Sequence, residues 1–100
     1  MNLHSEGNTL VIRGLTELNA INAAGFRDET RAALHARTTT LDVDLSQTRF
    51  VDSSGLGALI ALQKTMTTRG GAVRILNPTP GAQQILELTR LHRVFEIVKT

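Results

Sequence analysis

The chain of 100 residues contains no cysteine, tryptophan or tyrosine. Without cysteine, a disulfide scaffold, a cysteine nucleophile and a cysteine-ligated zinc site are excluded. The three phenylalanines are the only aromatic residues, which leaves few side chains for stacking on bases. Eleven basic and nine acidic residues give a formal net charge of +2, too small to indicate a nucleic-acid binder by itself. We therefore expect no metal, no cofactor and no direct contact with nucleic acid.

Long apolar stretches are also missing, and we expect no signal peptide. No apolar run approaches the length of about 18 residues that a membrane-spanning helix requires. Residues 1–6 lack the basic and then apolar pattern of a signal peptide. With 41% hydrophobic and 20% charged residues, the composition is that of an ordinary globular protein. We expect one domain spanning residues 1–100, located in the cytoplasm and without membrane insertion.

Strand-like and helix-like segments alternate along the chain. The apolar pattern predicts strands near residues 2–5, 9–13, 40–45 and 73–76, and a last short strand or a packed tail at residues 97–98. Helical spacing predicts helices from residue 22, from 54 to 68, where Gly70-Gly71 ends the helix, and from Pro80. Asn19 or Asn22 can supply the N-cap oxygen of the first helix. This order predicts an α/β fold with parallel crossovers and an antiparallel edge at the N-terminus.

The strand at residues 40–45 alternates strictly between apolar and acidic side chains. A strand covered by helices on both faces usually reads as a continuous apolar run. The alternation therefore predicts helices on one face, with Asp42 and Asp44 facing solvent opposite Arg13 and Arg74. The residues expected on the buried stripes of the three helices are Phe26, Thr30, Ala33, Leu34 and Arg37; Leu56, Leu59, Ile60, Gln63 and Met66 or Thr67; and Ile85, Leu86 and Leu88.

The most informative stretch is residues 52–57, Asp-Ser-Ser-Gly-Leu-Gly, where a loop enters the second helix. It places two hydroxyl groups where a helix has unpaired N–H groups and the positive end of its dipole. In one interpretation, Asp52 or Ser53 caps the helix and the two glycines allow tight packing. In the other, a hydroxyl is a phosphorylation site whose phosphate the helix dipole stabilises by about 0.3–1 kcal/mol. The residues alone leave both open.

This hexapeptide resembles the signature of STAS domains, and specifically of bacterial anti-sigma factor antagonists. The resemblance extends over nearly the whole chain, with residues 41–46 at the central strand, Gly70-Gly71 at the end of the next helix and residues 85–98 in the closing segment. It implies a STAS fold, with a mixed, mostly parallel sheet of four to five strands and helices mainly on one face. It also implies a protein that is not an enzyme.

In the family that the chain resembles, the serine directly after the aspartate is phosphorylated, which here is Ser53. The kinase, of the Bergerat ATPase fold, is itself the anti-sigma factor. The unphosphorylated antagonist binds it and releases the sigma factor, phosphorylation breaks that complex, and a PP2C-type phosphatase resets the switch. Residues 16–19, Thr-Glu-Leu-Asn, stand where antagonists commonly carry Gly-Glu-Leu-Asp. The implied partner-binding residues are Asp52, Ser54, Gly55, Leu56, Glu17, Asn19 and Asn22.

Other functions remain open at this stage. A hydrolase is disfavoured because no base accompanies Ser53 in the sequence and the three histidines lie in different elements. Some small STAS proteins are subunits of a lipid-transporting ABC system, and others are stressosome scaffolds. The ABC-linked group usually replaces the second serine of the motif, so Ser53-Ser54 favours the antagonist.

Overall fold

The computed structural model describes residues 1–100 as a five-stranded sheet with three α-helices and one short 3-10 helix. The strands are β1 (Asn2–Glu6), β2 (Thr9–Arg13), β3 (Thr40–Asp44), β4 (Ala72–Leu76) and β5 (Glu96–Val98). The helices are α1 (Ala23–Ala33), α2 (Ser53–Thr68), α3 (Pro80–Leu88) and the 3-10 helix η1 (Leu91–Arg93). Each strand and α-helix expected from the sequence is present. Where the sequence predicted the first or last residue of an element, the observed end lies within two residues of it.

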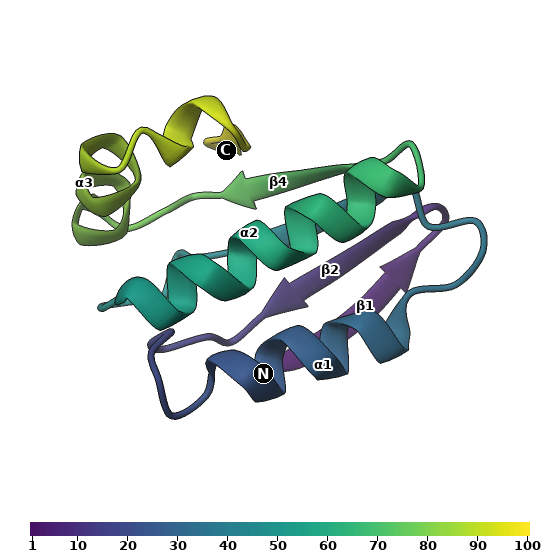
Figure 1. The fold of residues 1–100 in the computed structure, drawn as a ribbon, viewed down its shortest axis with the longest axis horizontal. Coiled ribbons are helices and arrows are strands. Elements are labelled where there is room, and N and C mark those ends of the chain that lie inside the picture. The colour runs from purple at the N-terminus through teal and green to yellow at the C-terminus, as the bar shows by residue number, and fades with distance from the viewer.

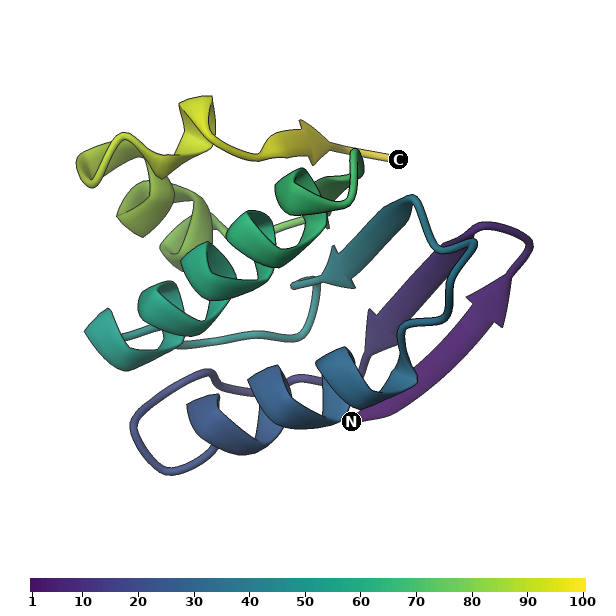
Figure 2. The ribbon, with the colours of Figure 1, turned by 45° about the vertical axis from the view of Figure 1, so that its right-hand side comes forward.

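The strands follow one another across the sheet in the order β1-β2-β3-β4-β5. β1 is antiparallel to β2, and every other neighbouring pair is parallel. α1 and α2 lie side by side across one face of the sheet, whereas α3 lies beyond the end of β4 (Figures 1 and 2). This arrangement confirms the predicted mixed, mostly parallel sheet with its helices mainly on one face.

A single cluster of 19 buried residues holds the helices on the sheet. Leu41, Val43 and Leu45 alternate along β3 as predicted and are almost fully buried. Leu59 and Leu62 of α2 are fully buried in the same cluster. Burying one leucine contributes about 1.5–3 kcal/mol to folding, so this packing fixes α2 firmly. None of the helices is both long enough and apolar enough to span a bilayer.

The expected stripe of α2 is wrong in part. Leu59 and Met66 are buried as predicted, but Leu56 and Gln63 are only partly buried and Leu62, which was not on the predicted stripe, is fully buried. α2 also begins at Ser53, one residue before the predicted start. The buried face of α2 is therefore rotated by about one residue from the predicted stripe, and it includes the small residues Gly55 and Ala58.

Asp42 corrects the prediction for the uncovered face of the sheet. The expected partners are present: Arg74 donates two hydrogen bonds of 2.7 Å to the Asp42 carboxylate, and Arg13 lies 3.8 Å from Asp44. However, Asp42 is only 5% exposed and does not face solvent. The bidentate pair with Arg74 makes this burial possible, since a buried carboxylate needs such a partner. Donating these hydrogen bonds to Asp42 also raises the pKa of Arg74.

Three further details at the helix ends differ from expectation. Asn22 is the N-cap residue of α1, but its side chain makes no capping hydrogen bond. Arg37 lies beyond the end of α1 and is exposed, so it is not on the buried stripe. Leu88 ends α3 and is 76% exposed, whereas Leu86 is buried as expected. Leu86 and Leu88 are two residues apart, about 200° around the helix, so only one of them can face the core.

Candidate functional site at the start of α2

The first turn of α2 presents two serines to solvent. Asp52 is the N-cap residue, and its Oδ1 accepts a hydrogen bond of 3.0 Å from the Gly55 backbone N–H. Ser53 and Ser54 occupy the first two helical positions, and both are exposed. Their backbone N–H groups have no acceptor within the chain. The site therefore combines accessible hydroxyl groups with free donors at the positive end of a helix dipole.

The loop between β2 and α1 lies directly beside this turn. Because β2 and β3 are parallel neighbours, the loops that follow them leave the same edge of the sheet. The Leu18 backbone N–H donates to the Phe50 carbonyl at 2.9 Å, and the Asp52 N–H donates to the Leu18 carbonyl at 3.1 Å. These bonds form an isolated parallel bridge between Leu18 and Val51. The two segments that the sequence singled out are thus joined.

Asp52 makes a second connection between these segments. Its Oδ2 accepts a hydrogen bond of 3.1 Å from the backbone N–H of Ala20. One carboxylate therefore caps α2 with one oxygen and holds the β2–α1 loop with the other. Its role in the geometry is to position, because both oxygens are engaged within the chain.

The two asparagines stabilise the loop rather than the helix. The Asn22 Oδ1 accepts from the Asn19 N–H at 2.8 Å, and its Nδ2 donates to the Glu17 carbonyl at 2.7 Å. The Asn19 Oδ1 accepts from the Ile21 N–H at 3.0 Å, which is the geometry of an Asx turn. Glu17 itself is exposed, as is expected for a residue that meets a partner.

Gly55 is placed differently from the other expected contact residues. It is buried, and a Cβ added to it would overlap the Leu18 carbonyl oxygen and lie 2.8 Å from the Leu18 Cγ. A partner cannot reach Gly55 directly, so it serves by letting the two segments approach. Gly57 has no atom within 4 Å of an added Cβ, so the tight-packing interpretation applies to Gly55 alone. Leu56 is half-buried beside them.

Two exposed apolar side chains near Ser53 were not singled out from the sequence. Ile21, in the β2–α1 loop, is 92% exposed, and Phe50, just before the bridge to Leu18, is 52% exposed. A large apolar residue in a loop of asparagine and alanine is the signal that could have identified Ile21. Exposed apolar residues on a shared surface are characteristic of contacts with another protein.

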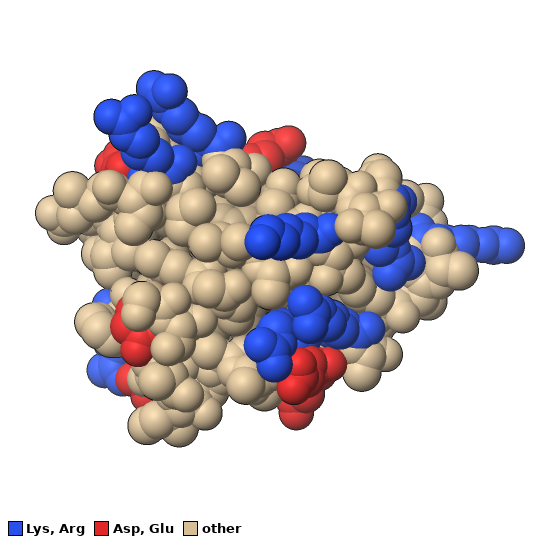
Figure 3. Space-filling view, viewed as in Figure 1, with Lys and Arg blue, Asp and Glu red and all other residues tan.

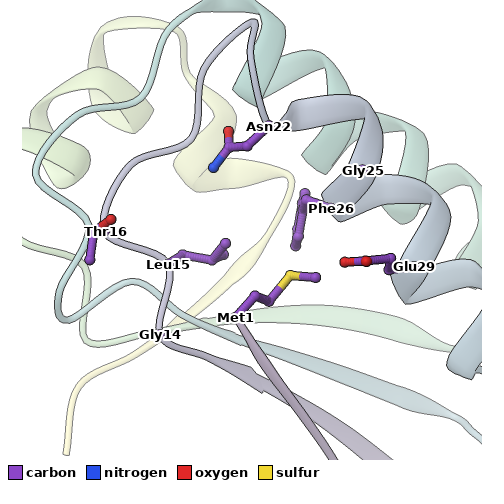
Figure 4. Close-up of a pocket in the computed structure, with 8 residues that line it drawn as sticks. All are labelled: Met1, Gly14, Leu15, Thr16, Asn22, Gly25, Phe26 and Glu29. Carbon is purple, nitrogen blue, oxygen red and sulfur yellow. The ribbon is translucent and has the colours of Figure 1, made fainter.

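The structure also contains a pocket of about 330 Å³, which lies between α1, the residue before β1 and the start of the β2–α1 loop (Figure 4). Its lining residues are Met1, Gly14, Leu15, Thr16, Asn22, Gly25, Phe26 and Glu29. Met1, Leu15 and Phe26 point toward one another, and Glu29 is the only charged side chain (Figure 4). No group of three or more acidic or histidine side chains is arranged to hold a metal ion. Of the expected site residues, only Asn22 lines this pocket.

Comparison with known protein families agrees with the geometry. The family model described as "Mlab, STAS domain" matches residues 1–99. The chain therefore belongs to the STAS domain family. The anti-sigma F factor antagonist of Lysinibacillus sphaericus is 30% identical over 84 residues, which cover 83% of this chain and 72% of that protein. Within the STAS family, the chain is a member of the anti-sigma factor antagonists.

A second curated relative, from Thermotoga maritima, carries the provisional name of anti-sigma factor antagonist. It is 30% identical over 56 residues, and this match spans 56% of the chain and half the length of that relative.

Solved structures show the same fold. A Thermotoga maritima structure with the same provisional name gives a TM-score of 0.89 at 22% identity, covering 99% of this chain and 85% of that one. The antagonist SpoIIAA in its unphosphorylated form gives 0.85 at 22% identity, covering 99% and 86%. The phosphorylated form of the Bacillus protein SpoIIAA gives 0.74 at 22% identity, covering 99% and 89%. At these identities the likeness establishes the fold.

Proposed function

We propose that the protein is an anti-sigma factor antagonist that acts as a phosphorylation-controlled binding switch, with no enzymatic activity. The unphosphorylated form binds an anti-sigma factor that is also a serine kinase of the Bergerat ATPase fold. Phosphorylation of Ser53 breaks the complex, and a PP2C-type phosphatase restores the binding form. The observation that carries the proposal is the exposed Ser53 hydroxyl, at the start of a helix that Asp52 joins to the neighbouring loop.

Ser53 is favoured over Ser54 by its surroundings as well as by the motif. Both side chains are exposed, but Ser54 lines a hollow between α1 and α2, whereas Ser53 lines none of the hollows of the molecule. Ser53 is therefore the hydroxyl with the freer access for a kinase. It also directly follows the aspartate, as the modified serine does in the family that the motif resembles.

The physical effect of the phosphate is local. It adds about −1.5 to −2 charges at pH 7 beside the free N–H groups of the first turn. Those donors and the helix dipole stabilise the phosphate in place, so the fold does not have to change. A partner that buries this surface would have to desolvate the phosphate, and every ~1.4 kcal/mol of that penalty weakens binding tenfold. Ile21 and Phe50 supply apolar area to the same surface.

The experiment uses the purified chain with the Bergerat-fold serine kinases of the same organism and ATP. We expect one phosphate on wild type and on Ser54→Ala, found at Ser53 by peptide mass mapping, and none on Ser53→Ala. In binding assays, Ser53→Ala retains the kinase in the presence of ATP, and Ser53→Asp does not bind it. Phosphate found only on Ser54 would overturn the residue assignment. If Ser53→Asp and Ser53→Ala both bind as wild type does, the switch itself is refuted.

One observation supports a second candidate function. The description of the matching family model names Mlab and not an antagonist. The corresponding candidate is the STAS subunit of a lipid-transporting ABC system. It predicts co-purification with an ATPase and membrane subunits from native lysate, with the same yield for wild type and Ser53→Asp. The antagonist predicts capture of a serine kinase, which the Ser53→Asp substitution abolishes.

A further inference from the structure

A groove lies between α1 and α2. It starts beside Ser54 and leads away from Ser53 along the two helices. Two hollows of about 410 and 350 Å³ lie along it. The first is lined by Ser54 and Arg27 among others, and the second by Arg31, Lys64 and Thr65. Gly57 lines both hollows and marks where they meet. The groove therefore begins beside the serines and continues along the two helices.

The glycine at the centre of this groove is not required by the fold. Gly57 lies inside α2, where glycine is about 1 kcal/mol less favourable than alanine. An added Cβ would meet no atom within 4 Å, in contrast to Gly55 two residues earlier. The residues beside it on the groove floor, Ala58 and Ala61, are also small. Packing therefore does not require a glycine at position 57. A glycine there keeps the groove open, because any larger side chain would narrow it.

Two cations on the walls of the groove, Arg31 and Lys64, form no direct ion pair, although the charge of Arg31 also acts on Asp28. Arg31 of α1 donates from its Nε to the Thr65 hydroxyl of α2 at 3.3 Å. Arg27, by contrast, is paired with Asp28. On this face, Lys and Arg side chains lie over the middle and right-hand part and at the upper left (Figure 3). Acidic side chains adjoin the middle group at the lower edge and also lie at the left and at the upper edge (Figure 3).

We propose that the groove between α1 and α2 binds an extended acidic segment of a partner protein, with Arg31 and Lys64 receiving its carboxylates. A peptide segment fits the groove because the small residues Gly57 and Ala61 leave room for its backbone beside the two cations. The inference rests on the proposed function in one respect, since the partner is taken to be the protein that also covers Ser53. It adds a second contact surface, continuous with the first through Ser54.

This arrangement also extends the effect of phosphorylation. A phosphate on Ser53 stands next to Ser54, at the entrance of the groove. It would oppose the part of the acidic segment that lies at this entrance by like-charge repulsion. Lys64 is eleven residues further along α2, about 16 Å away at 1.5 Å per residue, so the phosphate does not compete for that cation. Release of the partner would then draw on the groove as well as on the surface around Ser53.

The test uses a short fluorescein-labelled peptide of alternating glutamate and glycine as the probe. Its binding to the intact chain is followed by fluorescence anisotropy at low salt, and the site is mapped by amide chemical shifts. We expect saturable binding that weakens with salt, with shift changes at Gly57, Ala61 and Thr65. Lys64→Glu should weaken binding about fivefold or more, the scale of one lost ion pair, whereas Lys99→Glu, at an exposed cation in the C-terminal tail, should not.

Gly57→Leu provides a second variant, because it fills the groove without changing its charge. It should weaken peptide binding, and the matched Gly57→Ala should weaken it less, with both variants folded by circular dichroism. Equal binding by Lys64→Glu and Lys99→Glu, or shift changes away from the groove, would overturn the inference. Binding to vesicles of phosphatidylglycerol but not to the peptide would also overturn it, in favour of a membrane.

The peptide assay is independent of the kinase. If the peptide fails to bind while Ser53 is phosphorylated and releases the kinase, the groove inference alone is refuted. If the peptide binds in the groove but Ser53 is not phosphorylated, the proposed function alone is refuted.

Discussion

The carboxylate of Asp52 accepts a hydrogen bond of 3.1 Å from the backbone of Ala20, 32 residues earlier in the chain. The same carboxylate caps α2 through Gly55. Two segments that form one surface therefore depend on a single side chain, and this dependence can be measured.

Asp52→Ala should lower the free energy of unfolding by about 2 kcal/mol. It removes an N-cap, typically about 1 kcal/mol, and one further hydrogen bond of about 0.5–1.5 kcal/mol. Asp52→Asn should lose less stability than Asp52→Ala, because asparagine is an equally good N-cap. It should still lose some, because its single oxygen can replace only one of the two carboxylate oxygens. Urea denaturation measures both, with Glu87→Ala as the control at an exposed acidic position that forms no ion pair. Equal losses for Asp52→Ala and Glu87→Ala would contradict the double role.

The two motif glycines should respond in opposite directions to alanine. Gly55→Ala forces a methyl group against the backbone of Leu18 and should destabilise the fold by about 1–3 kcal/mol. Gly57→Ala meets open space and should be neutral or stabilise α2 by up to about 1 kcal/mol. The midpoints of urea unfolding compare them directly. A loss of stability in both variants would show that Gly57 is also needed for packing.

The acidic residues of β3 should differ in their contributions. Asp42→Ala removes two hydrogen bonds of 2.7 Å at a buried position, and we expect a loss of about 1.5–3 kcal/mol. The larger loss typical of a fully buried pair is not expected, because the Arg74 side chain is 36% exposed and can be hydrated. Asp44→Ala is the comparison: its ion pair with Arg13 spans 3.8 Å, but its Oδ1 also accepts a hydrogen bond of 2.8 Å from the Ser46 N–H. The loss should be about 0.5–1.5 kcal/mol, below that of Asp42→Ala. Thermal unfolding of the pair of variants tests the difference.

The exposed pair on α1 gives a prediction for acidic pH. The hydrogen bond from the Arg27 guanidinium lowers the pKa of Asp28 below its ordinary value. A lowered pKa in the folded state means that the pair stabilises the fold above the unfolded pKa, and that this is lost as pH falls through the folded pKa. Carboxyl carbon shifts in an NMR titration should show the low pKa, which Arg27→Gln returns toward normal. Arg31→Gln should move it less, since Arg31 acts only through its charge.

Asn19 offers a prediction about the residue that departs from the family pattern. Its Oδ1 accepts the Ile21 N–H, and an aspartate oxygen can do the same. Asn19→Asp should therefore keep its stability within about 0.5 kcal/mol, whereas Asn19→Ala loses the turn and should fall further. Urea midpoints measure both variants. If Asn19→Asp is as unstable as Asn19→Ala, the amide group has a role that its hydrogen bonds do not show.

The sequence predicted the fold well because strand and helix periods alternate along it without ambiguity. Where the prediction was wrong, a tertiary contact decided the outcome. Leu62 lies on a buried face of α2 that begins with Gly55 and Ala58, and small residues carry little weight in an apolar pattern. The Leu18 backbone against Gly55 is the tertiary contact that the sequence does not show. Asp42 is buried because Arg74 comes to it from another strand.

The site divides in the same way. Asp52, Ser53 and Ser54 could be located from the motif, since their positions follow from the helix start. The hydrogen bond from Ala20 to Asp52 and the exposure of Ile21 could not, because they depend on how the β2–α1 loop crosses the edge of the sheet. The Asn22 side chain does not cap α1, because its Oδ1 accepts from the Asn19 N–H and its Nδ2 donates to the Glu17 carbonyl within the loop.

The bridge between Leu18 and Val51 has a consequence for what a kinase can recognise. The surface around Ser53 is assembled from two segments that meet only in the folded chain. A linear peptide carrying residues 49–60 lacks the loop that Asp52 holds, and an unfolded chain lacks it too. Under the proposed function, such molecules would be poor substrates and poor ligands. The kinase would then bind and phosphorylate only correctly folded copies of the protein. Misfolded copies would neither occupy the kinase nor cause release of the sigma factor.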